Sequence, residues 1–218
     1  MFGGLESDDY INRFVQLYKE RTQAFVRKDV PRIVSVLREN LDLEAIPSGA
    51  RIVCLGIGEG LEVLALRQVF PNAKKILGVD TQIPSTDGLE RIESAGAIFE
   101  PLSAGNTTGI IRLLDDQPPD LVICRHPRIY KAIEGEGLVL TDSADRWAKI
   151  LIAWGKITTA QNGQLLVTTY FVKDRDLLAE QMHVAGLNPS TGESAYGYPV
   201  GEFADFDMKT DGFTLHVS

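Results

Sequence analysis

In the sequence RIVCLGIGEGL, residues 51–61, a short apolar run is followed by a turn with three glycines. The apolar run contains β-branched residues, which favour an extended strand. Gly56, Gly58 and Gly60 stand at every second position, and the next residues, 61–70, have apolar side chains at helical spacing. A strand that ends in a glycine turn and continues into a helix presents backbone N–H groups and the positive end of the helix dipole. Open α/β sheets bind their ligands at this edge.

Strand and helix patterns alternate along the rest of the chain, which predicts a mostly parallel sheet. Further strands are predicted at KKILGVD, AIFEPL, DLVICRH and QLLVTTYF, residues 74–80, 97–102, 120–126 and 164–171, each separated from the next by a helical pattern. The last two strands, residues 190–198 and 212–218, have no helix between them, so we expect this pair to be antiparallel.

Two helices are predicted before the first strand, one over residues 10–26 and a second beginning near Pro31. We therefore expect a single α/β domain over residues 1–218, in which residues 1–48 form an N-terminal helical extension and residues 49–218 form the core. A chain of 218 residues with 44% apolar composition is long enough to bury such a core.

The overall charge and composition exclude several classes of protein. A formal net charge of −8 disfavours binding to bulk nucleic acid or to an anionic membrane surface. No apolar run approaches the roughly 20 residues of a spanning helix, and the N-terminus has no signal-peptide pattern, so we expect a soluble, cytoplasmic protein. The two cysteines, Cys54 and Cys124, lie in apolar strand patterns and are expected to be buried thiols. No Cys/His cluster has the spacing of a metal site, so no metal is expected.

The segment VCLGIGEGLEVLAL, residues 53–66, resembles the first motif of the class I S-adenosylmethionine-dependent methyltransferases. ILGVDT, residues 76–81, and PPDLVICRHP, residues 118–127, are similar to the second- and fourth-strand motifs of that family, and the likeness extends from residue 51 to 218. The resemblance implies a three-layer sandwich with a seven-stranded, mostly parallel sheet of order 3-2-1-4-5-7-6, in which strand 7 is antiparallel.

The resemblance also implies S-adenosyl-L-methionine as the cofactor. In the family the glycine loop holds the amino-acid end of this cofactor, and an acid after the second strand, here Asp80, accepts hydrogen bonds from the ribose hydroxyls. The cofactor-binding residues that the resemblance implies are Gly56, Ile57, Gly58, Glu59, Gly60, Asp80, Thr81, Ser103 and Cys124.

The chain departs from the family pattern at two positions. Cys54 stands where most members have an acid, and a neutral thiol is a poor acceptor for an ammonium group. After the third strand, Ser103 stands where the family often has a further acid. These departures leave two alternatives: a cofactor site that uses backbone and hydroxyl groups, or a methyltransferase-fold scaffold with little cofactor affinity. An NAD(P)-dependent oxidoreductase is a third alternative. Two features count against it: the third glycine comes one position earlier than in the dinucleotide-binding pattern G-x-G-x-x-G, and the last two strands are antiparallel.

Candidate catalytic residues lie at the end of the fourth strand and in the connection after it. His126 is a candidate general base, although a histidine bonded to backbone in a loop stiffened by Pro127 is an equal alternative. Arg125 would hold an anionic acceptor or pair with an acid such as Asp120. Tyr130 lies in a long connection, residues 128–143, and would face the substrate. We expect a small-molecule acceptor, or else a protein, and a homodimer is compatible with the sequence.

Overall fold

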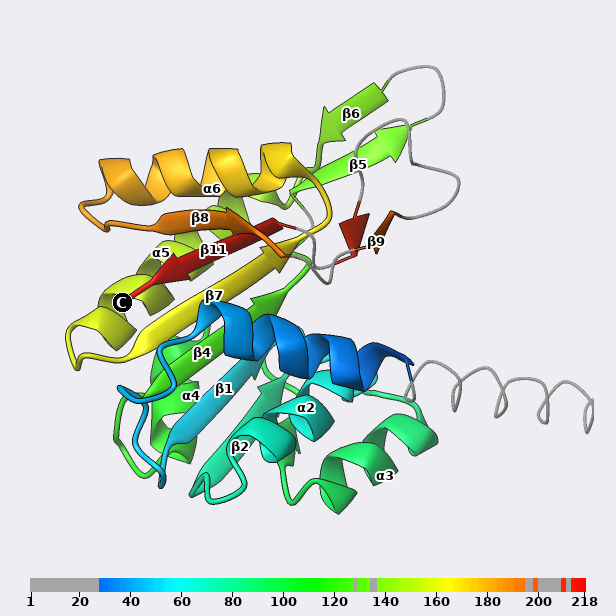
Figure 1. Cartoon of the computed structure of the whole chain (residues 1–218), viewed down its shortest axis with the longest axis vertical. Coiled ribbons are helices and arrows are strands. Elements are labelled where there is room, and N and C mark those ends of the chain that lie inside the picture. Colours follow the sequence, from blue (N-terminus) through cyan, green and yellow to red (C-terminus); the bar gives the residue numbers. More distant parts are fainter. Residues whose placement is uncertain (1–27, 128, 134–136, 195–197, 200–208, 211–212) are drawn as a thin grey trace, which may run out of the picture.

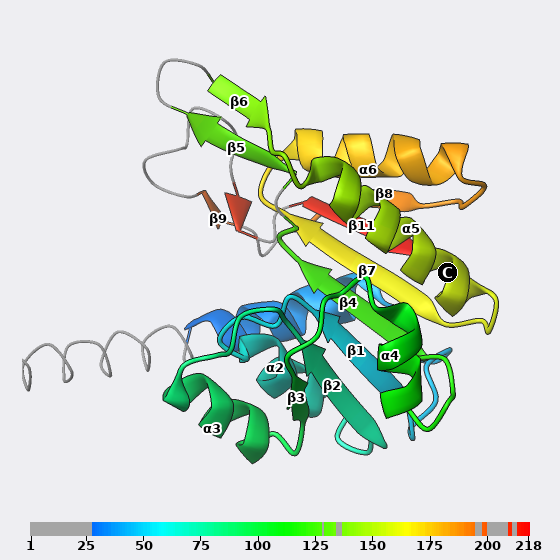
Figure 2. The same ribbon diagram turned by 180° about the vertical axis from the view of Figure 1, so that it is seen from behind.

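The computed structural model describes residues 28–127, 129–133, 137–194, 198–199, 209–210 and 213–218. They form three layers, a central twisted sheet with helices on both faces (Figures 1 and 2). The helix expected over residues 10–26 lies outside the described residues. The second N-terminal helix is present, and residues 28–40 are helical.

The central sheet has seven strands in the order β3-β2-β1-β4-β7-β11-β8. Their bounds are β1 Arg51–Leu55, β2 Lys75–Val79, β3 Ile98–Glu100, β4 Leu121–Arg125, β7 Gln164–Thr169, β8 Ser190–Glu193 and β11 Phe213–Val217. The pairings from β3 to β7 are parallel, whereas β11 runs antiparallel to both β7 and β8. The fold class is confirmed. The labels differ from 3-2-1-4-5-7-6 because two small ribbons intervene in the sequence; when only strands of the main sheet are numbered, the two orders agree.

The connection after the fourth strand differs from the long loop that was expected. It contains an antiparallel ribbon of β5 (Tyr130–Ile133) and β6 (Gly137–Leu140), which projects from the carboxyl edge of the sheet (Figure 1). A second ribbon pairs β9 (Tyr198–Pro199) with β10 (Lys209–Thr210). The predicted third and sixth strands are also shorter than their predicted ranges, 97–102 and 190–198, at three and four residues.

The helices form the two outer layers. Residues 28–40, α2 (Leu61–Val69) and α3 (Thr86–Ser94) cover one face, and α4 (Thr107–Leu113), α5 (Ala144–Thr159) and α6 (Val172–Val184) cover the other (Figures 1 and 2). Each face buries its own apolar cluster, so the central strands are buried on both sides. All six residues of β7 are buried, which explains its continuous run of uncharged residues. In the described part of the chain, no helix combines the length and apolar character needed to cross a membrane.

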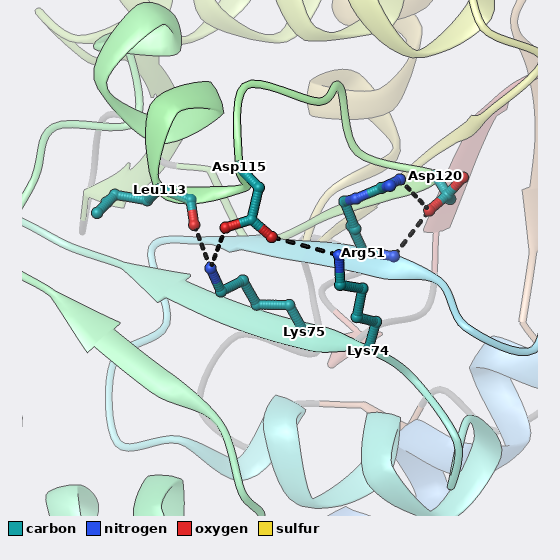
Figure 3. Close-up of polar contacts among 6 residues, drawn as sticks. All are labelled: Arg51, Lys74, Lys75, Leu113, Asp115 and Asp120. Atoms are coloured by element: carbon teal, nitrogen blue, oxygen red, sulfur yellow. Dashed lines mark hydrogen bonds and ion pairs between the residues drawn. The ribbon is translucent and has the colours of Figure 1, made fainter.

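Ion pairs stabilise the amino edge of the sheet, opposite the glycine turn (Figure 3). Asp120, at the start of β4, accepts a hydrogen bond from the backbone N of Arg51 at 2.7 Å and lies 3.6 Å from its guanidinium. Asp115 lies 3.4 Å from the Lys74 ammonium and 3.5 Å from that of Lys75. Hydrogen bonding to Lys74 and the Lys75 charge hold the pKa of Asp115 below its usual value. These charges therefore join β1 to β4 and β2 to the end of α4.

Candidate active site

A cleft of about 570 Å³ opens at the carboxyl edge of the sheet, above β1, β2, β4 and β7. This volume is within the usual range for small-molecule sites, about 300–1,000 Å³. Strand ends and loops form its floor and one side, and α5 forms another side. The lining residues are Gly56, Gly58, Glu62, Val79, Asp80, Thr81, Gln82, Ser103, Ala104, Arg125, His126, Ser143, Arg146, Trp147, Ile150 and Tyr170.

The three glycines of the turn have different roles, although all have left-handed backbones with φ of 68°, 51° and 77°. A Cβ on Gly60 would lie 2.7 Å from Cγ1 of Ile92 in α3, so this glycine allows close helix packing. A Cβ on Gly58 would meet no atom within 4 Å, and one on Gly56 would make only an ordinary contact, 3.8 Å from the Trp147 ring. Gly56 and Gly58 therefore present bare backbone to the cleft.

Ile57 lies under the turn and not in the cleft. It is 1% exposed, and its side chain fills the space above Gly78 in β2, where an added Cβ would overlap Cδ1 of Ile57. The backbone N–H groups of Gly56 and Ile57 donate to the carbonyl oxygen of Val79 at 2.8 and 3.3 Å. Any contribution of Ile57 to a ligand site is therefore indirect, through the position of the turn.

Asp80 follows β2 and lines the cleft beside the glycine turn. Its Oδ2 accepts a hydrogen bond from the N–H of Gly58 at 3.3 Å, and its Oδ1 accepts one from the N–H of Gln82 at 3.0 Å. Thr81 and Gln82 line the same side. The carboxylate thus fixes the turn and also faces the cleft, where it can accept further hydrogen bonds.

Glu59, also expected to bind the cofactor, does not line the cleft. Its carboxylate accepts hydrogen bonds from the hydroxyl and the backbone N–H of Ser85, the N-cap of α3. It also forms an ion pair with Arg91 at 3.0 Å. These contacts hold Glu59 against α3, so its role in the structure is to join the glycine turn to that helix.

A largely buried ion pair lies at the end of the cleft above β1 and β4. Arg125 Nη1 donates to Oε1 of Glu62 at 2.5 Å, and the two side chains are 10% and 13% exposed. The alternative in which Arg125 pairs with Asp120 is wrong, because Asp120 lies at the start of β4, where it binds Arg51. Arg125 is the last residue of the same strand, so the length of β4 separates the two side chains.

The two cysteines lie in the strands next to this ion pair, on opposite faces of the sheet, and both are fully buried, as expected. Burial, and next the nearby Glu62 charge, raise the pKa of both the Cys54 and the Cys124 thiols well above the ordinary value. Both thiols are therefore neutral, and neither side chain lines the cleft. The structure places Cys124, an expected cofactor residue, in the core cluster under α5.

His126 lines the cleft and directly follows β4. Its backbone is left-handed, with φ of 52°, and its N–H donates to the carbonyl oxygen of Thr168 at 2.8 Å. Its ring stacks on the ring of Tyr170, with centroids 3.8 Å apart and planes 20° apart. Both rings line the cleft, so the imidazole is accessible to a ligand. Ser103 also lines the cleft, and its hydroxyl accepts a hydrogen bond from Arg146 at 3.1 Å.

No protein-family model and no curated protein matches the sequence. The structure of the chain does match solved structures of other proteins. Fibrillarin from Aeropyrum pernix, in complex with natively bound S-adenosyl-L-methionine, is 14% identical with a TM-score of 0.54, covering 85% of this chain and 73% of fibrillarin. Precorrin-6y C5,15-methyltransferase from Geobacter metallireducens is 13% identical with a TM-score of 0.52, covering 87% and 86%. The chain has the class I methyltransferase fold.

A cyclopropane-fatty-acyl-phospholipid synthase-like protein from Lactobacillus casei matches over the largest share of both chains among these three. It is 13% identical with a TM-score of 0.57, and the match covers 89% of this chain and 92% of that protein. Identities this low show the common fold only. Differences at the site of this methyltransferase-fold chain must therefore be interpreted from its own residues.

Tyr130 is placed away from the cleft of the methyltransferase fold. Its side chain packs against the core cluster under α5 and α6, and its backbone N–H donates to Oδ1 of Asp174 at 2.8 Å. Asp174 also accepts from the N–H of Phe171 at 3.3 Å. Burial raises the pKa of Asp174 to about 7, although the two N–H donors act in the opposite direction. A buried carboxyl thus joins the base of β5 to the start of α6.

Several residues of the cleft were not predicted. Ser143, Arg146, Trp147 and Ile150 lie on one side of α5, and their spacing of three and four residues is the pattern of a single helix face. This spacing was the available signal, but it is shared by the buried stripe of the same helix. Glu62 was also missed, and nothing in its local sequence distinguishes it from Glu59. Within the described residues, no group of three or more His, Cys, Asp or Glu side chains is arranged to hold a metal ion.

Proposed function

We propose that this protein is an S-adenosylmethionine-dependent methyltransferase that acts on a small-molecule acceptor. The observation that supports this most is the position of Gly56, Gly58 and Asp80, which bring bare backbone and a carboxylate to one side of a cleft. Fibrillarin, with the same fold, was solved with this cofactor bound. The cleft volume of about 570 Å³ has room for a nucleoside cofactor together with a small acceptor.

The residues present fit this cofactor. Asp80 would accept hydrogen bonds from the ribose hydroxyls, Gly56 and Gly58 would allow close approach to the backbone, and Ser103 lines the same cleft. When bound, the cofactor supplies an electrophilic methyl group on a positively charged sulfur. Transfer of that group needs alignment of the acceptor in line with the breaking bond and exclusion of water, which the walls of the cleft can provide.

His126 is our candidate for removing a proton from the acceptor. Its ring lines the cleft and is held against Tyr170, so its position is defined before an acceptor binds. An imidazole is suited to proton transfer near neutral pH. The net charge of −8 favours a small acceptor over bulk nucleic acid.

A methyltransferase-fold scaffold without cofactor is the second candidate. The observation in its favour is the neutral thiol of Cys54, which stands within β1 at the position where the resemblance implies an acid. Binding measurements separate the two candidates, because a scaffold has no affinity for the cofactor.

The test is calorimetric titration with S-adenosylmethionine and S-adenosylhomocysteine. We expect micromolar binding by the natural protein and a loss of about tenfold or more in the Asp80→Asn variant, which corresponds to about 1.4 kcal/mol or more. Glu90→Gln, an exposed change on α3, removes one negative charge outside the cleft and serves as the control. Undetectable binding by the natural protein would reject the proposed enzyme, and binding of NADH instead would favour the oxidoreductase.

A further inference from the structure

The Glu62–Arg125 pair and Asp80 lie at two separate places along the floor of the cleft. Asp80 follows β2, whereas Arg125 ends β4, and β1 lies between these strands. Adjacent strands are about 4.8 Å apart, so the two strand ends are about 10 Å apart. A ligand that spans the cleft therefore meets one isolated carboxylate at Asp80 and one pair of opposite charges at the other end.

The ion pair has an apolar wall behind it. On the side away from the cleft lie Ile33, Val36 and Leu37 from the helix of residues 28–40, together with Leu66, Ile123, Leu166 and the hydroxyl-bearing Thr168. The gap on that side, about 10 Å³, is no larger than one water molecule. With hydrocarbon on one side, the two charges act mainly on groups that enter the cleft, where their interactions are stronger than in bulk water.

Glu62 has acceptor capacity left for such a group. Its Oε1 accepts from Arg125, and among the described residues no other polar group bonds to this carboxylate. Since Glu62 lines the cleft and is 13% exposed, a ligand group can reach it. A carboxylate accepts up to about four hydrogen bonds, and an ammonium group is a hydrogen-bond donor of the opposite charge.

Glu62 comes from the same side of the sheet as Cys54. The Cys54 side chain lies in the cluster under α2, and Glu62 lies in the first turn of α2, close enough for its charge to act on the thiols of both Cys54 and Cys124. A carboxylate supplied by the helix thus reaches the position above the end of β1 that the neutral thiol cannot serve.

We propose that Glu62, held in place by Arg125, binds the ammonium group at the amino-acid end of the cofactor, in a role that the buried thiol of Cys54 cannot fill. This inference rests on the proposed function. Arg125 is a positioning residue in this arrangement, because it fixes the carboxylate that makes the contact.

The test compares two probes with the natural protein and with Glu62→Gln. S-adenosylhomocysteine carries the amino-acid end, and 5′-methylthioadenosine lacks it. A hydrogen bond to a charged group corresponds to about a 10- to 100-fold change in affinity. We expect Glu62→Gln to lower the affinity for S-adenosylhomocysteine by about this factor and to leave the affinity for methylthioadenosine within about twofold of the natural protein. Asp80→Asn should lower the affinity for both probes. Glu90→Gln is the control for the lost charge.

Removal of Glu62 alone takes away the carboxylate that pairs with the largely buried Arg125 charge, which can destabilise the fold. The double variant Glu62→Gln with Arg125→Met removes both charges, and we expect it to fold and to show the same selective loss. Retained methylthioadenosine binding reports an intact cleft in either variant.

Equal effects on both probes, or unchanged S-adenosylhomocysteine binding in Glu62→Gln, would overturn the role of Glu62 while the proposed function stands. If the natural protein binds neither probe, the proposed function fails and this inference fails with it.

Discussion

Replacement of Asp174 by asparagine should change how the stability of the protein depends on pH. Asp174 is 2% exposed and accepts backbone N–H groups from Tyr130 and Phe171 at 2.8 and 3.3 Å. Burial raises its pKa from 3.8 to about 7. The folded protein therefore holds a proton on this group that the unfolded chain releases between pH 4 and pH 7. The unfolding free energy must decrease as the pH rises through that interval.

The magnitude follows from the two pKa values. A shift of about three units corresponds to about 4 kcal/mol in total, lost between pH 4 and pH 8. Because the sequence pI is near 4.9 and a protein near its pI tends to associate, measurements should stay above pH 5.5. Between pH 5.5 and 8.0 the Asp174 contribution falls by about 2 kcal/mol. An asparagine side chain cannot titrate, so this part of the pH dependence should disappear in Asp174→Asn.

The assay is urea unfolding of the natural protein, Asp174→Asn and Glu180→Gln, at half-unit steps from pH 5.5 to 8.0. Glu180 is an exposed acid on the same helix, and we expect its variant to follow the natural protein. The quantity compared is the difference in unfolding free energy between the natural protein and each variant. A difference for Asp174→Asn that stays constant with pH, or that rises toward pH 8, would show that Asp174 is ionised in the fold and that the reasoning is wrong.

Two further predictions concern the cleft. Gly60→Ala should lower the unfolding free energy by about 1–3 kcal/mol, because its Cβ would lie 2.7 Å from Ile92 in a left-handed backbone. Gly58→Ala adds no contact within 4 Å and should lower the unfolding free energy by only about 1 kcal/mol, and urea unfolding of both variants checks the difference. In His126→Asn the new residue tolerates the left-handed φ of 52°. The variant should lower kcat about 10²- to 10⁴-fold with any acceptor whose proton must be removed, while the affinity for S-adenosylhomocysteine stays unchanged. A fall in that affinity instead would assign His126 to cofactor binding.

The fold could be predicted from the sequence because its signals are local. Each strand of the parallel sheet is a short apolar run followed by a helical pattern, and the missing helix before β11 indicated its antiparallel direction. The β5–β6 ribbon was missed, although two short apolar runs, YKAI and GLVL, flank the glutamate- and glycine-containing residues 134–136, a spacing typical of a hairpin. Its length suggested a loop instead.

The candidate site was less accessible to sequence reasoning because its contacts are distant in the chain. Glu62 and Arg125 are 63 positions apart, and only the sheet order brings them together. Glu59 lies between Gly58 and Gly60, and Glu62 follows Gly60. Gly60 interrupts the helical phase with a left-handed residue, so spacing alone does not say which acid faces the cleft. Ile57 was assigned to the ligand by resemblance. In the structure its side chain packs over Gly78 of β2, which has no side chain, and this contact between the turn and a neighbouring strand is not visible in any local pattern.

The seating of Ile57 above Gly78 has a consequence for the kinetics of ligand binding. The glycine turn is held by this buried contact, by two hydrogen bonds to Val79 and by the bond from Gly58 to Asp80. A turn that is held in one shape before binding loses little conformational entropy when a ligand arrives. Association should then proceed in a single phase whose rate rises in proportion to ligand concentration, without the plateau that a slow rearrangement of the turn would impose.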